Sequence, residues 1–420
     1  MVVLITSQIA RNLISIFFLI VSIKYRRYFL LLIPFLQYAG LFLKPHHPEI
    51  NFIISYAELL ILGIFAFQEG FRLKDTTPQC LFLLPFLSLP SLLCAQGNLY
   101  QSIFIISLLS LSAFLYIFYL KNMEWFLNKN IFDLIVLVWI VFGILTKIYV
   151  GIMMGRALPL PTWVYIIINR GGGLGGSNHA GGIILFFLPF VRDYRILSLA
   201  TLFLFTTFSR GIYAPLILLW IILLFIRKKN ELLKAFILLC IVFCLIWNFI
   251  PHTDQNRFSF SNYLFNRTIG ISTSWGTTIS EKIKNRIFKD TRWDIYGQAL
   301  KIFKKTSYRG IGLGGFAWGQ EFIGRTRKYS NAHNLYLTLL CEGGIPFFLG
   351  FFGLLFYMFR LAFRYSRNGL ISLSIFACYG LYSGEIYEAS RLVSACDYYY
   401  LIFLLAFLTY MKKSKEIQNN

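Results

Sequence analysis

Long apolar runs recur along nearly the whole of this chain, and they limit what it can fold into more than any other feature does. Runs of about 17–25 residues are long enough to cross a membrane as helices. The composition agrees, because 57% of the 420 residues are hydrophobic and only 14% are charged. A membrane β-barrel would need alternating segments of about ten residues, and these runs do not alternate. The sequence therefore predicts an all-α, polytopic integral membrane protein.

We expect about 12 or 13 transmembrane helices from the number of apolar runs. The first run lacks a basic leader and a small-residue cleavage site, so we interpret it as a span rather than a signal peptide. The runs lie near residues 3–23, 28–43, 51–68, 79–95, 102–120, 131–153, 181–191, 196–209, 211–226, 235–250, 335–359, 369–384 and 394–411. The chain then divides into N-terminal transmembrane helices (1–155), core transmembrane helices with a Gly-rich outer loop (156–250), a large basic outer loop (251–334) and C-terminal transmembrane helices (335–420).

Positive charge is distributed unevenly between the connections. Short basic connectors are typical of the cytoplasmic side, which places the C-terminal end of the chain inside. The loop 251–334 is different, since it holds 14 Lys and Arg residues against 5 Asp and Glu residues, out of a formal net charge of +22 for the chain. Long loops do not follow the positive-inside rule, so this charge needs another cause. An anionic substrate or the anionic membrane surface are the two physical options.

Four short stretches carry candidate chemistry. In FTTFSRGIYAPL, Arg210 lies between two apolar runs, where an arginine is costly unless it faces water or a partner. An anion-binding arginine and an interfacial arginine both fit this position. In DTRWDIYGQALKIFKK, the residues Trp293, Tyr296, Leu300 and Phe303 recur at helical spacing. This pattern predicts an amphipathic helix that begins near Arg292 and lies on the outer membrane surface with Lys301, Lys304 and Lys305 near lipid phosphates.

The glycine-rich stretch Gly310-Ile-Gly-Leu-Gly-Gly315 follows that helix. It resembles a phosphate-binding loop but lacks a preceding strand and a Lys-Ser or Lys-Thr ending, so nucleotide binding is not expected. Glycines here allow tight turns or a close backbone approach to a ligand. His333-Asn334 then opens the run at 335–359. Imidazole titrates near neutral pH, which suits the deprotonation of a hydroxyl group.

Taken in order, SRG, RW, GxGxGGF and HNLYL followed by EGGIPFF resemble the bacterial O-antigen ligase and O-antigen polymerase superfamily. The resemblance covers roughly residues 175–355. It implies a fold related to the lipid-dependent (GT-C-like) membrane glycosyltransferases, with one large periplasmic loop that carries amphipathic helices. It also implies a glycan donor carried on undecaprenyl diphosphate, used at the periplasmic face of the inner (cytoplasmic) membrane.

Carried over residue by residue, the resemblance gives three catalytic candidates. Arg210 and Arg292 match the family arginines thought to hold the diphosphate, and His333 matches the histidine proposed to act on the acceptor hydroxyl. His179, between Asn178 and Ala180, departs from the family pattern and receives no catalytic role. Further predicted substrate contacts are Arg170, Asn334, Arg309, Gly312 and Gly314.

The expected reaction is a single displacement at the anomeric carbon that inverts its configuration. Arginines can neutralise the diphosphate that leaves, so we expect neither a metal nor another cofactor. Three carboxylates remain alternatives to His333 as the base, namely Asp290, Asp294 and Glu342, although Asp290 is more simply a helix cap and Glu342 a packing residue. Glu58, in an early apolar run, has no assigned partner.

Polymerase and ligase activities use the same donor, and the motifs do not separate them. We lean to a polymerase, which joins repeat units on a glycan-lipid acceptor, because it does not presuppose lipopolysaccharide; a ligase would transfer the chain to lipid A–core. Expected partners are these lipid substrates, membrane lipids and, for a polymerase, a chain-length regulator; nucleic acid is not expected. A polysaccharide-lipid transporter or flippase is the alternative from another class, and a structural or sensory protein is a third.

Overall fold

The computed structural model describes residues 76–95, 99–110, 112–155, 177–205, 210–226, 233–234, 236–237, 291–326, 332–381 and 395–419. Every element of regular structure in these ranges is a helix, and no strand occurs among them. The chain divides into two compact units, one formed by residues 1–129, 295–373 and 380–420 and the other by residues 130–294 and 374–379. The all-helical class predicted from the apolar runs is confirmed for the described residues.

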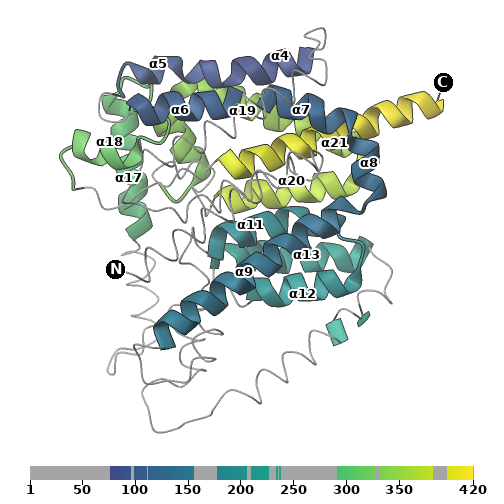
Figure 1. Cartoon of the computed structure of the whole chain (residues 1–420). Coiled ribbons are helices and arrows are strands. Elements are labelled where there is room, and N and C mark those ends of the chain that lie inside the picture. The colour runs from purple at the N-terminus through teal and green to yellow at the C-terminus, as the bar shows by residue number, and fades with distance from the viewer. Residues whose placement is uncertain are drawn as a thin grey trace, which may run out of the picture. The chain divides into compact units, whose positions relative to one another are not determined.

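The first unit is built from helices drawn from three parts of the chain (Figure 1). Helix α21 packs along α7, and α19 packs on η2, on α5 and on α21. Its elements are α4 (Thr76–Leu83), η2 (Leu84–Ser88), α5 (Leu89–Leu92), α6 (Leu99–Ser110), α7 (Ser112–Lys121), α8 (Met123–Asn128), most of α17 (Thr291–Lys305), α18 (Phe316–Phe322), α19 (Leu335–Tyr365), the first half of α20 (Arg367–Gly380) and α21 (Ala395–Asn419).

Aromatic rings hold α7, α8 and α21 together. The ring of Tyr119 meets that of Phe403 edge to face, with centroids 5.0 Å apart and planes at 87°, and Phe126 lies 5.8 Å from Phe403. All three side chains are buried. Such edge-to-face pairs add to the stabilisation from burying the rings themselves. Helix α21 is thereby fixed against helices nearly 300 residues earlier in the chain.

Helix α19 is the described helix that is long and apolar enough to cross a membrane. It begins at Leu335, where the sequence predicted a span to begin, and runs on to Tyr365. It is broken at Gly344, whose φ of 75° and ψ of −178° are not helical, and Pro346 follows at once. Shorter apolar helices of 10–17 residues lie at Cys80–Leu92, Ile105–Lys121, Ile131–Val141, Gly181–Phe190 and Tyr194–Phe205.

The second unit contains α9 (Ile131–Gly155), α11 (Ser177–Phe187), η4 (Leu188–Phe190), α12 (Tyr194–Phe205) and α13 (Arg210–Ile226). Helix α9 packs on both α11 and α12, and α13 packs on α11. The rings of Phe132 and Phe190 stack with centroids 4.4 Å apart, and Asp133 Oδ1 accepts the main-chain N–H of Arg192 at 2.8 Å. These contacts tie the start of α9 to the turn before α12.

Several expectations about topology are not tested by the described residues. The apolar runs at 3–23, 28–43 and 51–68 lie outside them. The multi-pass arrangement and the division of the chain at residues 155, 250 and 334 stay predictions.

Candidate functional site

The site begins with His333, which lies directly before α19 in the first unit. Its side chain is partly exposed, and its φ of 49° lies in the left-handed region. That conformation costs a residue with a Cβ roughly 1–2 kcal/mol, so it persists only where the surroundings hold it. The backbone then turns to an extended Asn334, with φ −151° and ψ 117°, which caps the helix. The predicted catalytic histidine therefore occupies a strained and partly accessible position at a helix start.

Asn334 uses both ends of its carboxamide within the protein. Oδ1 accepts the main-chain N–H of Leu337 at 3.0 Å, which caps α19. Nδ2 donates to the main-chain carbonyl of Leu381 at 3.2 Å, just after α20 ends. The side chain thus joins the start of α19 to the end of α20. Its predicted contact with substrate stays a prediction, and these bonds give it a structural role as well.

The glycine-rich loop approaches α19 at main-chain distance. Gly310, Gly312 and Gly314 have φ values of 86°, 96° and 75°, which favour glycine. The N–H of Ile311 donates to the carbonyl of Cys341 at 2.9 Å, and the N–H of Gly312 donates to that of Glu342 at 2.9 Å. A Cβ on Gly310 would lie 2.4 Å from the Glu342 carbonyl oxygen. The close approach expected for a ligand is therefore an approach to the protein's own helix.

Glu342 completes this contact with its side chain. Its carboxylate is buried, and it accepts the N–H of Gly314 at 2.8 Å on Oε2 and the N–H of Phe316 at 3.1 Å on Oε1. The N–H of Ile345 donates to the carbonyl of Tyr308 at 3.2 Å. We call residues 308–316 together with residues 341–345 the Glu342 clasp. It attaches the connection after α17 to the break in α19.

The clasp bears on two expectations. The amide groups of Gly312 and Gly314, predicted to contact substrate, both donate to Glu342. Glu342 itself was a rival for the base, yet both of its oxygens accept buried amides. Sequence reasoning missed this pairing. The available signal was a lone carboxylate in an apolar run, which must find donors, and a glycine-rich loop upstream that could supply them.

Helix α17 packs on the protein core mainly through residues outside the predicted apolar face, which the sequence assigned to the membrane surface. Ile295, Ala299 and Ile302 are buried in a cluster with Phe316 and Cys341. Of the predicted apolar face, Phe303 is buried, Tyr296 is partly exposed, and Trp293 and Leu300 are exposed. The helix therefore has apolar side chains on two sides, and the predicted side is the more exposed of the two. Its last residue, Lys305, donates to the carbonyl of Phe322 and lies 4.5 Å from that ring, so it faces the protein.

The structure describes the four candidate arginines to different extents, from the whole residue at Arg309 to none of Arg170. Arg309 is exposed on the connection after α17, and its carbonyl lies beside Gly344, where a Cβ would come within 2.2 Å of it. Arg292 lies in the first turn of α17, and Arg210 is the first residue of α13 in the second unit; their side chains lie outside the described structure. Near Arg210, the Tyr213 hydroxyl donates to the Phe205 carbonyl at 2.7 Å, which bridges the ends of α12 and α13. Arg170 lies outside the described residues.

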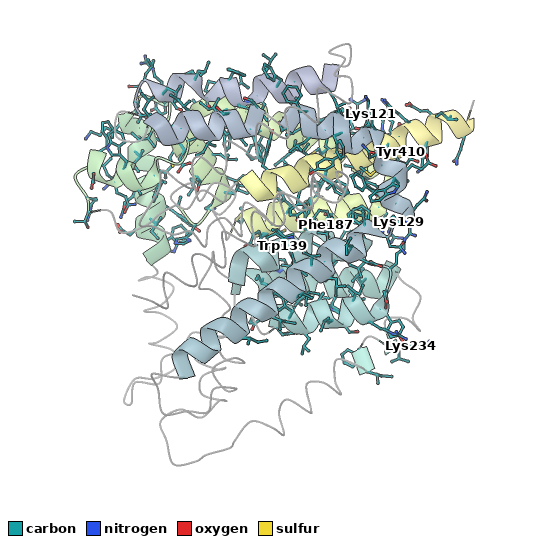
Figure 2. All side chains as sticks on the ribbon, viewed as in Figure 1. Lys121, Lys129, Trp139, Phe187, Lys234 and Tyr410 are labelled. Atoms are coloured by element: carbon teal, nitrogen blue, oxygen red, sulfur yellow. The ribbon has the colours of Figure 1, made fainter. Side chains whose placement is uncertain are left out.

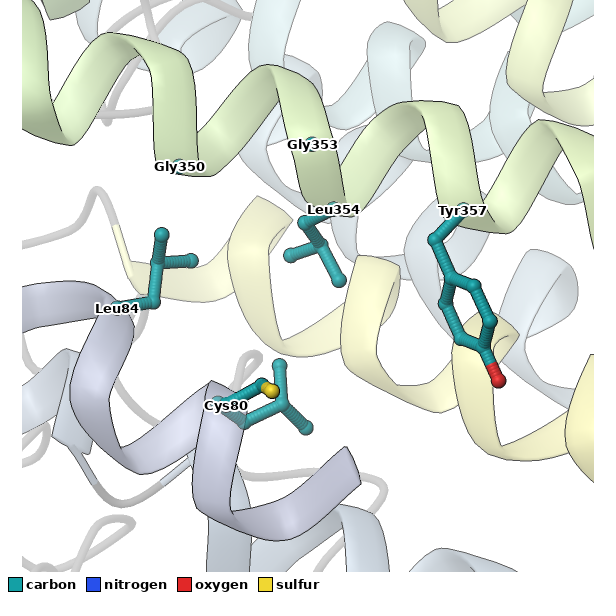
Figure 3. Close-up of a pocket in the computed structure, with 7 residues that line it drawn as sticks. Cys80, Leu84, Gly350, Gly353, Leu354 and Tyr357 are labelled. Carbon is teal, nitrogen blue, oxygen red and sulfur yellow. The ribbon is translucent and has the colours of Figure 1, made fainter. Parts of the chain in front are cut away.

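A cavity of about 380 Å³ lies between α4 and α19 (Figure 3). It contains no cationic side chain that could hold a diphosphate. Its lining is Cys80, Leu81, Leu84, Gly350, Gly353, Leu354 and Tyr357.

Residues 196–352 match the protein family described as O-antigen ligase. This match supports the O-antigen ligase and polymerase superfamily for the segment. It begins in α12 and ends within α19, so it contains Arg210, Arg292, the glycine-rich loop, His333 and Glu342. No curated protein matches the chain. The resemblance expected from the ordered motifs is confirmed, and it supports a membrane glycosyltransferase of the O-antigen ligase or polymerase type.

The other residues that the sequence singled out fall in three groups. Asp294 is exposed on α17, and Asp290 and Glu58 lie outside the described residues. His179 lies in α11. Within the described ranges, no three His, Cys, Asp or Glu side chains gather as they would around a metal ion. The roles of the individual site residues, and catalysis without a metal, stay predictions.

Proposed function

We propose that this protein is an inverting membrane glycosyltransferase of the O-antigen ligase and polymerase superfamily. It transfers a glycan from undecaprenyl diphosphate to a sugar hydroxyl at the periplasmic face of the inner membrane. The observation that carries the proposal is the family match over residues 196–352, which contains all three catalytic candidates in order. A second support is that His333 directly precedes a helix able to cross a membrane.

In the proposed reaction, the acceptor hydroxyl oxygen attacks the anomeric carbon. A new glycosidic bond forms while the bond from that carbon to the diphosphate oxygen breaks, and undecaprenyl diphosphate leaves with the electron pair. His333 orients the hydroxyl and accepts its proton. Arg210 and Arg292 neutralise the charge on the leaving diphosphate, for which the planar guanidinium is well suited. One displacement inverts the anomeric configuration.

The distribution of exposed cations supports an outward-facing His333. At the C-terminal end of α19, Arg360 and Arg364 are exposed, and Lys415 of α21 lies 5.9 Å from the ring of Tyr365. Figure 2 shows Lys121, at the end of α7, on the same side of the first unit as Tyr410 of α21. Basic residues beside short connections favour the cytoplasm. His333 lies at the other end of the 31-residue α19, which supports a periplasmic position.

The exposed face of α19 supports burial in lipid. Leu349, Phe356 and Phe363 are 61%, 74% and 79% exposed, and they recur at spacings of seven residues. Large side chains exposed along one stripe are typical of a surface that meets lipid or another apolar partner. We infer that α19 is one of the spans of a multi-pass protein.

Within the superfamily we favour a polymerase over a ligase, and the difference is testable. Purified protein is given a synthetic undecaprenyl-diphosphate-linked repeat unit, with lipid A–core present or absent, and products are separated on a gel. A ladder without lipid A–core identifies a polymerase, whose chain length a partner protein would then regulate. Product only with lipid A–core identifies a ligase. No transfer of cognate sugars in either condition, from protein shown to be folded, would favour a transporter.

A further inference from the structure

His333 and Asn334 lie at a junction between two helices of the first unit. Asn334 donates to the carbonyl of Leu381, which lies 47 residues further along the chain. Beside this bond, Gly380 packs against Leu335. A Cβ on Gly380 would lie 3.1 Å from Leu335 Cδ2 and 3.3 Å from Leu335 Cβ, which is closer than ordinary van der Waals contact. One hydrogen bond and one tight apolar contact therefore fix the start of α19 against the end of α20.

The strained backbone of His333 makes this junction relevant to the imidazole. The direction of the side chain depends on a left-handed φ of 49°, followed by an extended residue. The backbone at His333 would relax from this conformation if no contact with another part of the protein held it, because the conformation is unfavourable by itself. Helix capping alone does not supply that support, because the bond from Leu337 acts only within α19. The bond to Leu381 is a link that reaches outside the helix.

We propose that Asn334 is a positioning residue, which holds His333 in its catalytic orientation through the bond from Nδ2 to the Leu381 carbonyl. The proposal rests on the function proposed above, in which His333 handles the acceptor proton. It differs from the role of substrate contact predicted from the sequence, because both ends of the carboxamide bind main-chain groups of the protein. Gly380 supports the same junction by allowing α20 to approach Leu335 closely.

Two variants test the junction without adding charge. Asn334→Ser keeps a good helix cap but is too short to reach Leu381. Gly380→Ala keeps every polar group and forces Leu335 away by a few tenths of an ångström. The matched control is Gly353→Ala, also in a helix, where an added Cβ would meet nothing within 4 Å. All three are measured as full-length protein in the transfer assay, with kcat and KM determined separately for donor and acceptor.

We expect Asn334→Ser and Gly380→Ala to lower kcat by about 10- to 100-fold, because small misplacements of a catalytic group cost rates of that order. KM for both substrates should stay within about twofold of the wild-type value. The variants do not alter interactions that bind the substrate equally in the ground state and the transition state, and loss of such interactions is what raises KM. Gly353→Ala should behave as the wild type. A raised KM with unchanged kcat in Asn334→Ser would show that Asn334 binds substrate, and the proposal would be wrong. Unchanged kcat and KM in both junction variants would overturn it equally.

A readout that does not need activity separates this inference from the proposed function. The imidazole NMR signal of His333, assigned by its loss in His333→Gln, should shift or broaden in both junction variants and stay in place in Gly353→Ala. If wild-type protein transfers no glycan, the proposed function fails, and this signal still decides whether the junction positions His333. A signal that is unchanged in Gly380→Ala and Asn334→Ser would refute the positioning role.

Discussion

At the scale of single residues, His333 combines a proposed catalytic role with an unfavourable backbone conformation. The sequence predicted the histidine at the N-terminal end of an apolar helix, because the apolar run starts at Leu335, and the helix also begins there. It could not give the left-handed φ of 49° or the bond from Asn334 to Leu381, since both depend on a helix end 47 residues away. Strain of this kind is common where function rather than stability sets the conformation.

This conflict predicts how substitutions at His333 change stability. His333→Gly should keep the apparent melting temperature or raise it, because the relief of about 1 kcal/mol from the left-handed conformation offsets the extra freedom of glycine in the unfolded chain. His333→Val should lower it by the equivalent of about 1–2 kcal/mol, since a β-branched residue tolerates positive φ poorly. Thermal unfolding of purified protein in detergent checks both. A lower melting temperature for the glycine than for the valine variant would mean that strain at His333 is not as described.

At the scale of elements, the Glu342 clasp decides how the connection after α17 meets α19. Glycines at 310, 312 and 314 predicted tight turns or close approach, and the structure shows an approach to the main chain of residues 341–344. The pattern alone could not identify the partner, because a phosphate and a carboxylate both bind main-chain amides. Helix α17 has apolar residues on two faces, and the sequence predicted the largely exposed face but not the one formed by Ile295, Ala299 and Ile302 that packs on the core.

Substitutions at three glycines separate two effects that occur together in the clasp, namely a positive φ and the lack of space for a Cβ. In Gly310→Ala the new Cβ meets both an unfavourable φ of 86° and main-chain atoms at 2.4–2.5 Å, so we expect the largest loss of stability, more than about 2 kcal/mol. Gly324 has a φ of 78° but open space, so Gly324→Ala should cost about 1 kcal/mol. Gly297 lies within α17 with open space, and Gly297→Ala should stabilise by about 0.5–1 kcal/mol.

Melting temperatures of the three variants in detergent give the order directly. The clasp requires Gly310→Ala to be the least stable of the three, and open space around helical Gly297 requires Gly297→Ala to be the most stable. If Gly310→Ala has the same melting temperature as the wild type, then residues 308–316 do not lie against α19 as described.

At the scale of the whole molecule, hydropathy and ordered motifs carry most of what the sequence can predict. Apolar runs predicted helices such as α9 and α19 because length and composition suffice for that inference. They could not predict that α21 packs along α7, since such pairings depend on complementary side chains far apart in the chain. The resemblance to the family followed from motif order, whereas the membrane topology stays a proposal.

Orientation of the first unit is testable by labelling with a membrane-impermeant maleimide, in a background without reactive native cysteines. Arg325→Cys, in the exposed part of the loop 251–334, should be labelled in intact spheroplasts. Lys415→Cys, beside the exposed cations at the end of α19, should be labelled only after the membrane is permeabilised. The reverse pattern would place His333 on the cytoplasmic side and exclude a periplasmic reaction.

The central claim is that His333 carries glycan transfer from a lipid diphosphate. Its most direct test is the initial rate of transfer from an undecaprenyl-diphosphate-linked donor by wild type, His333→Gln and the control Glu124→Gln, which changes an exposed residue of α8. With folding matched by melting temperature, the rate should fall by about 10²- to 10⁴-fold for His333→Gln and stay near the wild-type rate for Glu124→Gln. Transfer by His333→Gln at the wild-type rate would contradict the account.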